Sequence, residues 1–316
     1  MSTNPVLAEV VRSGFVEGLH RGALVALNPD GSVAFAAGDV RTPIFPRSAN
    51  KPLQAAGMVR AGLPLTGQLL ALATASHSGE PFQLDAVRKI LADAGLPESA
   101  LQTPPDLPID PVARLGYLRA GGQPAPLAMN CSAKHAAMLV TAAVNDWPLD
   151  SYRDPDHPLQ LALRDTVAEL AGEPVAATGV DGCGAPLFAL SLTGLARAFA
   201  TISLAAAGSA EHRVAEAMRT HPEFVAGTRR DVTKLIRAVD GLIAKEGAEG
   251  VLGLALADGT ALALKIDDGA DRARPPVARA ALRRLGVATA ELGEFLVSPV
   301  LGGGQPVGEV RAVPFG

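Results

Sequence analysis

The stretch VLGLALADGTALALKI, residues 251–266, contains two apolar segments separated by Asp258-Gly259. An Asp-Gly pair accepts the positive backbone φ that both central positions of a tight two-residue turn require. The flanking apolar residues are typical of buried strands. The stretch therefore predicts a β-hairpin whose strands cover residues 251–257 and 260–266.

A second hairpin is predicted near the other end of the chain. Apolar residues from Phe15 to Gly38 lie on both sides of Asn28-Pro29-Asp30-Gly31, a sequence rich in turn formers. Because both hairpins carry apolar strands, we expect the two ends of the chain to meet in one sheet.

The segment between the hairpins has helical spacing. Residues 84–94 repeat their apolar positions every three to four residues and stop at Gly95. Further helices are expected after Pro158, over 231–244 and over 276–285. The predicted fold is α/β (α+β), with a sheet built from both chain ends and a central helical lobe in a single compact unit of two lobes. The sheet lobe covers about 10–46 and 250–316, and the helical lobe about 47–249.

Composition excludes several classes of protein. The 316 residues are 48% hydrophobic and 19% charged, which indicates a globular chain with a large core. The net charge of −4 does not suit nucleic acid. The most apolar stretch, 187–207, contains Arg197 and is better interpreted as a buried helix than as a membrane span. No export signal precedes Arg12, the first cation, and two cysteines suit a reducing compartment. We expect a cytoplasmic protein without membrane or nucleic-acid partners.

The first chemical motif is Arg47-Ser48-Ala49-Asn50-Lys51-Pro52. It precedes a helical pattern, so Ser48 and Lys51 fall on one face near a helix N-terminus. A lysine amine there can remove the serine proton during attack on a carbonyl, and the helix N-terminus favours an oxyanion. Taken alone, the same letters also fit a surface serine and a solvated lysine.

Two further positions carry polar groups next to apolar runs. Ser76-His77-Ser78-Gly79-Glu80 follows an apolar segment, where rigid elements often position a functional loop. Its alternative interpretation is an ordinary turn before a helix. Lys265 lies in the second strand of the 251–266 hairpin and is either an edge cation or a group placed into a site.

The two cysteines lie in different loops. Cys131 stands one turn before Lys134 at the start of an apolar stretch, and Cys183 lies in a glycine-rich loop. Two thiolates from distant loops can hold a soft cation, but structural zinc normally takes four nitrogen or sulfur ligands. From these residues alone, two buried free thiols are the simpler interpretation.

Taken in order, these blocks resemble the bacterial asparaginase II family, the Rhizobium-type L-asparaginases. The resemblance spans roughly residues 10–315, and it implies an αβα sandwich similar to the fold of serine β-lactamases and glutaminases. The matching blocks are Val16-Glu17 with His20-Arg21, Arg47 to Pro52, Ser76 to Glu80, Asn130 to His135, Asp181-Gly182-Cys183, and Lys265 to Gly269.

The resemblance implies two Ser-Lys pairs in one active site, Ser48 with Lys51 and Ser76 with Lys265. Ser48 would attack the side-chain amide of L-asparagine, release ammonia and leave an aspartyl ester for water to hydrolyse. Lys51 would be the base of Ser48. Ser76 and Lys265 would relay protons, and neighbouring cations would hold down the pKa of each lysine.

The resemblance also implies a zinc ion held by Cys131, Lys134 and Cys183, which we expect to shape the substrate pocket without activating water. It suggests a homodimer. The chain departs from the family pattern at Ala133, where Gly is common, and at Gln83, where His is common. Candidate partners of the substrate α-carboxylate are Arg47 and His135, and the candidate partner of the α-ammonium is Asp181.

Two classes of alternative remain open. One is another acyl-transfer enzyme of the same fold, such as a glutaminase, a penicillin-hydrolysing enzyme or an esterase. Asparagine and glutamine differ by one methylene, which is worth only about 1 to 3 kcal/mol in many pockets. The other is a non-catalytic zinc or amino-acid binding protein, which would bind ligand tightly without releasing ammonia.

Overall fold

A computed structural model describes residues 4–288, 292 and 296–315. Its main sheet is antiparallel, with the strand order β6-β7-β8-β2-β1-β10-β9 and β3 added beside β2. A separate small sheet contains β4 and β5. The strands are β1 Val6–Arg12, β2 Phe15–Leu27, β3 Val33–Ala37, β4 Thr178–Val180, β5 Pro186–Phe188, β6 Ile243–Gly247, β7 Val251–Ala255, β8 Ala261–Ile266, β9 Ser298–Gly302 and β10 Gln305–Ala312.

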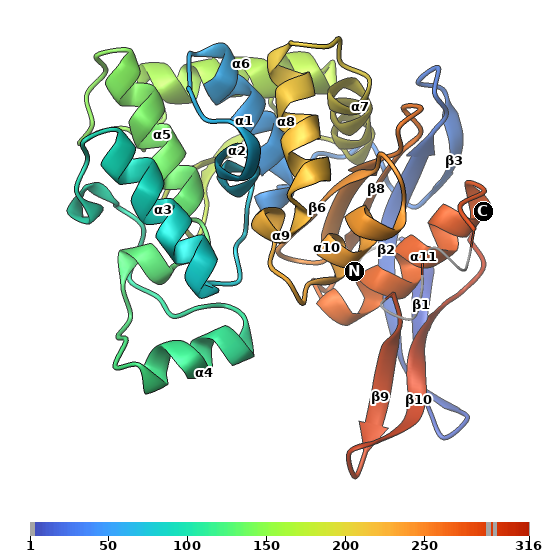
Figure 1. Ribbon diagram of the computed structural model, residues 1–316. Coiled ribbons are helices and arrows are strands. Elements are labelled where there is room, and N and C mark those ends of the chain that lie inside the picture. The colour runs from blue at the N-terminus through green and yellow to red at the C-terminus, as the bar shows by residue number, and fades with distance from the viewer. Residues whose placement is uncertain (1–3, 289–291, 293–295, 316) are drawn as a thin grey trace.

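The helices gather on one side of the main sheet in Figure 1, except α11, which lies beside β1 and β10. The α-helices are α1 Lys51–Arg60, α2 Gly67–Ala73, α3 Pro81–Asp93, α4 Pro111–Arg119, α5 Ser132–Val144, α6 Pro158–Ala171, α7 Leu192–Ser203, α8 Ala210–Thr220, α9 Pro222–Val225, α10 Asp231–Ala238 and α11 Arg274–Arg284. Short 3-10 helices cover Arg47–Asn50 (η1), Glu98–Ala100 (η2), Pro126–Ala128 (η3) and Asp271–Ala273 (η4).

Both predicted hairpins are confirmed. At the β7–β8 turn, Gly259 has a φ of +90° and the Asp258 carboxylate accepts a hydrogen bond from the Thr260 N–H at 2.9 Å. The turn between β2 and β3 is closed by the Asn28 N–H, which donates to the Ser32 carbonyl at 2.8 Å. Turn chemistry that is readable from the sequence thus sets both connections.

The two ends of the chain meet in the sheet, as predicted. β1 pairs with β10, with Ala8 opposite Ala312, and β2 pairs with β8, with Ala23 opposite Lys265. Figure 1 shows these blue and red strands side by side. The predicted fold class is therefore confirmed, and the helical segment is an insertion between strands of one sheet.

One predicted helix is wrong over its second half. The helix expected over 231–244 ends at Ala238, and Ile243 already begins β6. Gly241, with a φ of +70°, breaks the helix, and the apolar residues after it pair with β7. The sheet therefore gains a strand before residue 250. This strand lies against the start of α1, because a Cβ on Gly247 would meet the Pro46 carbonyl oxygen at 2.3 Å.

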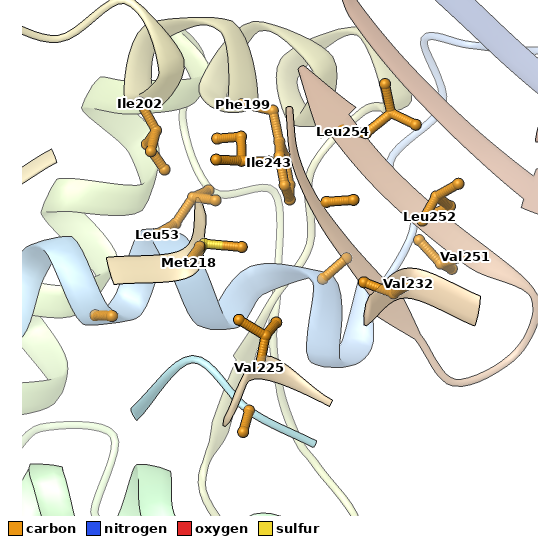
Figure 2. Packing of buried hydrophobic residues seen from close by; sticks show 14 of the residues in the cluster. Leu53, Phe199, Ile202, Met218, Val225, Val232, Ile243, Val251, Leu252 and Leu254 are labelled. Carbon is orange, nitrogen blue, oxygen red and sulfur yellow. The ribbon is translucent and has the colours of Figure 1, made fainter. Parts of the chain in front are cut away.

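Small aliphatic side chains fill the core between the sheet and the helices. Figure 2 shows Phe199 and Ile202 of α7, Met218 of α8 and Leu53 of α1 near Ile243 of β6. Phe199 lies over Gly253 of β7, where an added Cβ would come within 2.4 Å of the ring. Within the described residues, no helix has both the length and the apolar character of a membrane span.

Candidate active site

Lys51 is the first residue of α1 and is buried, with 1% of its surface exposed. Its Nζ donates hydrogen bonds to the Ala75 carbonyl at 2.5 Å and to Ser76 Oγ at 3.1 Å. A third contact joins Nζ to Cys131 Sγ at 3.1 Å. One side-chain nitrogen therefore connects α1, the segment after α2 and the loop before α5.

Ser48 lies in η1, one turn before Lys51, and its carbonyl accepts the Lys51 backbone N–H. Pro52 occupies the first turn of α1, where its missing N–H leaves no donor unsatisfied. Arg47 precedes Ser48 with a φ of +52°, which is strained for a residue other than glycine. The sharp turn places Ser48 at the surface of a cavity while Lys51 points into the interior.

The Ser76 segment is held by buried polar contacts. The His77 N–H donates to the Asn130 carbonyl at 3.0 Å, and His77 Nε2 lies 2.8 Å from Ser132 Oγ. Because the Ser132 hydroxyl donates to the Leu127 carbonyl, it accepts from His77 Nε2–H. Burial and then the charge of Lys51 lower the pKa of His77 to about 3, so its ring is neutral. His77 therefore positions the segment and is not a proton donor to substrate.

Gln83, one of the departures from the family pattern, also anchors this segment. It forms a capping box at the start of α3, in which its Oε1 accepts the Glu80 N–H at 3.2 Å. Its Nε2 donates to the Glu223 carbonyl at 2.9 Å. Gln83 thus ties the end of the Ser76 segment to α9.

Ser48 and Ser76 line one cavity of about 120 Å³. The two predicted serines are therefore brought together, with Lys51 bonded to one of them and following the other by three residues. The other lining residues include one amide side chain and four charged ones. They are Ile109, Asn130, Arg230, Glu246, Gly247, Ala248, Asp271 and Arg274.

Lys265, predicted as the partner of Ser76, does not reach this cavity in the described structure. Its Nζ donates to the carbonyls of Glu249 and Ile266, both at 2.6 Å. The physical reason is strand order. η1 lies against β6 and, less extensively, β7, and β8 follows beyond β7. Lys265 is therefore two strands away from β6, the strand that packs most against the Ser48 turn.

A lysine that the sequence analysis missed lies on β6. Lys245 is fully buried, and its Nζ donates to the Glu246 carbonyl at 2.9 Å and lies 3.1 Å from Glu246 Oε2. Burial lowers the pKa of Lys245 to about 8. Glu246 opposes the shift, and the charges of Lys51 and Arg230 add to it. The sequence does carry a signal for this lysine, the stretch Lys245-Glu246-Gly247-Ala248. Its charged residues directly follow apolar ones, at the end of the segment that was predicted to be a helix.

Both cysteines are buried free thiols. A hydrogen bond between them raises the pKa of Cys131 and lowers that of Cys183. Lys134 Nζ lies 3.3 Å from Cys183 Sγ. Burial alone would lower the pKa of Lys134, but the negative charge of the sulfur atoms reverses that effect and raises it. The predicted zinc ligands therefore come together next to Lys51.

The donor set fits zinc in chemical type, with two sulfur atoms and one nitrogen. The described residues hold no cluster of three or more His, Cys, Asp or Glu side chains suited to a metal, so Lys134 is needed as the third ligand. His135 is not a fourth. Among the described residues it does not cluster with the two cysteines in a metal-binding group, and its Nδ1 lies 2.7 Å from Tyr152 OH. Three protein ligands leave one zinc position open.

The three residues predicted to hold the amino-acid head group do not line the serine cavity in the described structure. Arg47 Nε and Asp181 Oδ1 form an ion pair with each other at 2.8 Å. His135 is fully buried behind Cys183 and bonded to Tyr152. Arg47 and Asp181 therefore pair with each other, and His135 pairs with Tyr152, inside the protein.

The comparisons with known proteins identify the family of this chain. The family model for L-asparaginase II matches residues 8–312. The chain therefore belongs to the L-asparaginase II family. No match was found among curated protein sequences.

Several solved structures are similar at low sequence identity. Mglu in its glutamate form has a TM-score of 0.46 and 15% identity over 87% of this chain, which spans 62% of the length of Mglu. A β-lactamase from Mycobacterium bovis has a TM-score of 0.45 and 16% identity, covering 83% of this chain and 94% of its own. A putative β-lactamase from Bacteroides dorei has a TM-score of 0.45 and 17% identity, covering 84% and 93%.

Proposed function

We propose that this chain hydrolyses the side-chain amide of L-asparagine to L-aspartate and ammonia through a serine acyl-enzyme. The observation that carries the proposal is the cavity shared by Ser48 and Ser76, with Lys51 bonded to Ser76 Oγ at 3.1 Å. A hydroxyl nucleophile needs an adjacent group to take its proton, and a buried amine serves in that role.

In this mechanism Ser48 Oγ attacks the amide carbon, and its proton passes to the neutral amine of Lys51. Ser76 then carries a proton from Lys51 to the leaving nitrogen, so that ammonia departs and an aspartyl ester remains on Ser48. Water attacks this ester along the same proton route in reverse, which releases L-aspartate and restores the serine.

The second amine of the proposed mechanism is Lys245 and not Lys265. Lys245 is buried beside the cavity residue Glu246, and the charge of Lys51 acts on it. With a pKa of about 8, it exchanges protons near neutral pH. Lys265 is half-buried and held by backbone carbonyls on the far side of β7.

We also propose that Cys131, Cys183 and Lys134 hold zinc in the working enzyme. Bound zinc supplies a fixed positive charge and a rigid arrangement of its ligand loops. Cys131 contacts Lys51 Nζ, so the ligand loop fixes the position of the base. Because serine and lysine already supply nucleophile and base, activation of water is not assigned to zinc.

The test is ammonia release from L-asparagine and, separately, from L-glutamine. We expect release from asparagine by the wild type, loss of release in Ser48→Ala, and full release in Ser32→Ala, a matched control on the exposed β2–β3 turn.

Activity that survives in Ser48→Ala would refute the nucleophile assignment. Preference for glutamine would make the enzyme a glutaminase. Nitrocefin turnover without amide hydrolysis would favour the penicillin-type alternative, and binding without turnover the non-catalytic one.

A further inference from the structure

Four charged side chains line the serine cavity, and the mechanism above uses none of them directly. They are Arg230, Glu246, Asp271 and Arg274. The Glu246 side chain is 5% exposed and that of Arg274 is 7% exposed. Burying charges costs several kcal/mol per ion unless partners compensate. Their gathering beside two reactive serines indicates a ligand that carries charges of both signs.

Glu246 keeps one carboxylate oxygen without a hydrogen bond. Its Oε1 accepts from Arg230 Nη2 at 3.0 Å. Its Oε2 is buried and lies 3.1 Å from Lys245 Nζ, yet within the described residues it has no hydrogen-bonded partner. Burial by itself would raise the pKa of Glu246, but Lys245, Arg230 and Arg274 outweigh it and lower the pKa to about 2. Glu246 is therefore an ionised carboxylate at the cavity, with Arg230 at one oxygen and Lys245 at the other.

The Arg230 guanidinium has hydrogen-bond donors that no described residue accepts. A guanidinium carries five N–H donors. In the part of the chain that the structure describes, the Arg230 side chain makes one hydrogen bond, to Glu246. Arg274 is less available, because its Nη2 donates to Asp231 at 2.7 Å.

The loop before Arg230 is pinned to the segment that carries Ser76. The Thr228 N–H and hydroxyl donate to the two oxygens of Glu80 at 2.8 and 2.7 Å. Gly227, with a φ of +143°, packs so closely that an added Cβ would lie 2.0 Å from Ser78 Oγ. The Arg230 loop is thus held against the Ser76 segment, which fixes Arg230 in the cavity as a recognition group must be.

We infer that Arg230 binds the α-carboxylate and Glu246 the α-ammonium of the substrate, so that the cavity accepts free amino-acid amides and rejects amides that lack either group. The inference rests on the proposed function and names its specificity residues. A zwitterion matches the alternating charges: its carboxylate can accept from the free donors of Arg230, and its ammonium can pair with the Glu246 carboxylate that lines the cavity. An amide without one head group leaves a buried charge unpaired, which a polar site discriminates against strongly.

The experiment crosses two variants with three substrates. L-Asparagine carries both head groups, succinamate lacks the α-ammonium, and 3-aminopropanamide lacks the α-carboxylate. We expect wild-type kcat/KM to favour asparagine over each analogue by about 100-fold or more. In Glu246→Gln the preference over succinamate should fall below about 10-fold, while the preference over 3-aminopropanamide persists. Arg230→Gln should show the reverse pattern.

Binding of the product gives a readout that does not depend on turnover. L-Aspartate should raise the melting temperature of the wild type and of the control Arg237→Gln, an exposed arginine paired with Glu223. It should stabilise Glu246→Gln and Arg230→Gln much less. Where a variant fails to fold, Glu246→Asp or Arg230→Lys replaces it in the same comparison.

The outcomes separate the two proposals. Variants that keep the wild-type preference for both head groups, or that L-aspartate stabilises as fully as the wild type, overturn the inference. A wild type that releases no ammonia from any of the three amides overturns the proposed function instead. In that case the L-aspartate melting shifts still decide whether Arg230 and Glu246 bind an amino-acid head group.

Discussion

Lys51 Nζ donates a hydrogen bond to Ser76 Oγ at 3.1 Å, although the two residues are 25 positions apart in the chain. The same nitrogen contacts Cys131, one of the proposed zinc ligands. Lys51 therefore lies where the serine cavity and the cysteine pair meet, and it contacts both.

A matched pair of variants distinguishes the roles of Lys245 and Lys265, the two lysines on the sheet. Lys245→Met removes the buried second amine of the proposed mechanism, so kcat should fall by at least about 100-fold. Lys265→Met removes an amine that is bonded to two backbone carbonyls, and kcat should stay within about threefold. Steady-state kinetics on L-asparagine measure both. An equal loss of kcat in the two variants would show that Lys265 also acts in the active site.

Local motifs predicted part of this site, and long-range packing determined the rest. The spacing of Ser48 and Lys51 is local, and a helix start is readable from Pro52. The choice between Lys245 and Lys265 depends on which strand lies against η1, and no short pattern specifies strand order. The same holds for Arg230 and Glu246, which come from separate elements and meet only in the folded chain.

Lys245 should also give stability a distinctive dependence on pH. Its pKa falls from 10.5 in the unfolded chain to about 8 in the folded protein, so the unfolded state binds more protons between these values. The free energy of unfolding contributed by Lys245 therefore rises with pH across this window, by about 3 kcal/mol in total. Urea unfolding at pH 7.5 and pH 10 measures the rise.

The comparison for this prediction is Lys245→Met against Lys89→Met. Lys89 is an exposed partner of Asp93, so its removal should leave the rise intact. Lys245→Met should flatten it. A rise of equal size in both variants would show that other groups produce it and that Lys245 titrates at its ordinary pKa.

The buried ring of His77 should make the free energy of unfolding depend on pH in a second range, at acidic pH. Its pKa falls from 6.5 to about 3 on folding, because the ring is buried and faces the charge of Lys51. The unfolded chain therefore binds more protons between pH 6.5 and pH 3, and the stability contributed by neutral His77 is lost as the pH falls, by at most about 5 kcal/mol. His77→Gln keeps an N–H donor for Ser132 and removes the titration. Its unfolding free energy should decline less steeply than that of the wild type between pH 6.5 and pH 4.

Removal of zinc should affect substrate binding more than chemistry. Chelation at neutral pH frees Cys131, Cys183 and Lys134, which loosens the loops around Lys51. We expect a higher KM for L-asparagine, with a measurable burst of ammonia from the first turnover retained. Stopped-flow detection of the burst, with circular dichroism to verify the fold, makes the measurement. Disappearance of the burst from a folded, zinc-free protein would assign zinc to the chemical step.

Gly227 is predicted to be intolerant of alanine because it holds the Arg230 loop against the Ser76 segment. A Cβ at Gly227 would lie 2.0 Å from Ser78 Oγ and 2.8 Å from Glu80 Oε1, and its φ of +143° is unfavourable for other residues. Gly227→Ala should therefore cost about 1 to 3 kcal/mol of stability and raise KM by displacing Arg230. The matched control is Gly116→Ala in α4, where nothing lies within 4 Å of the added Cβ and a gain of about 0.5 to 1 kcal/mol is expected. A Gly227→Ala protein with wild-type stability and KM would show that the loop position does not set Arg230.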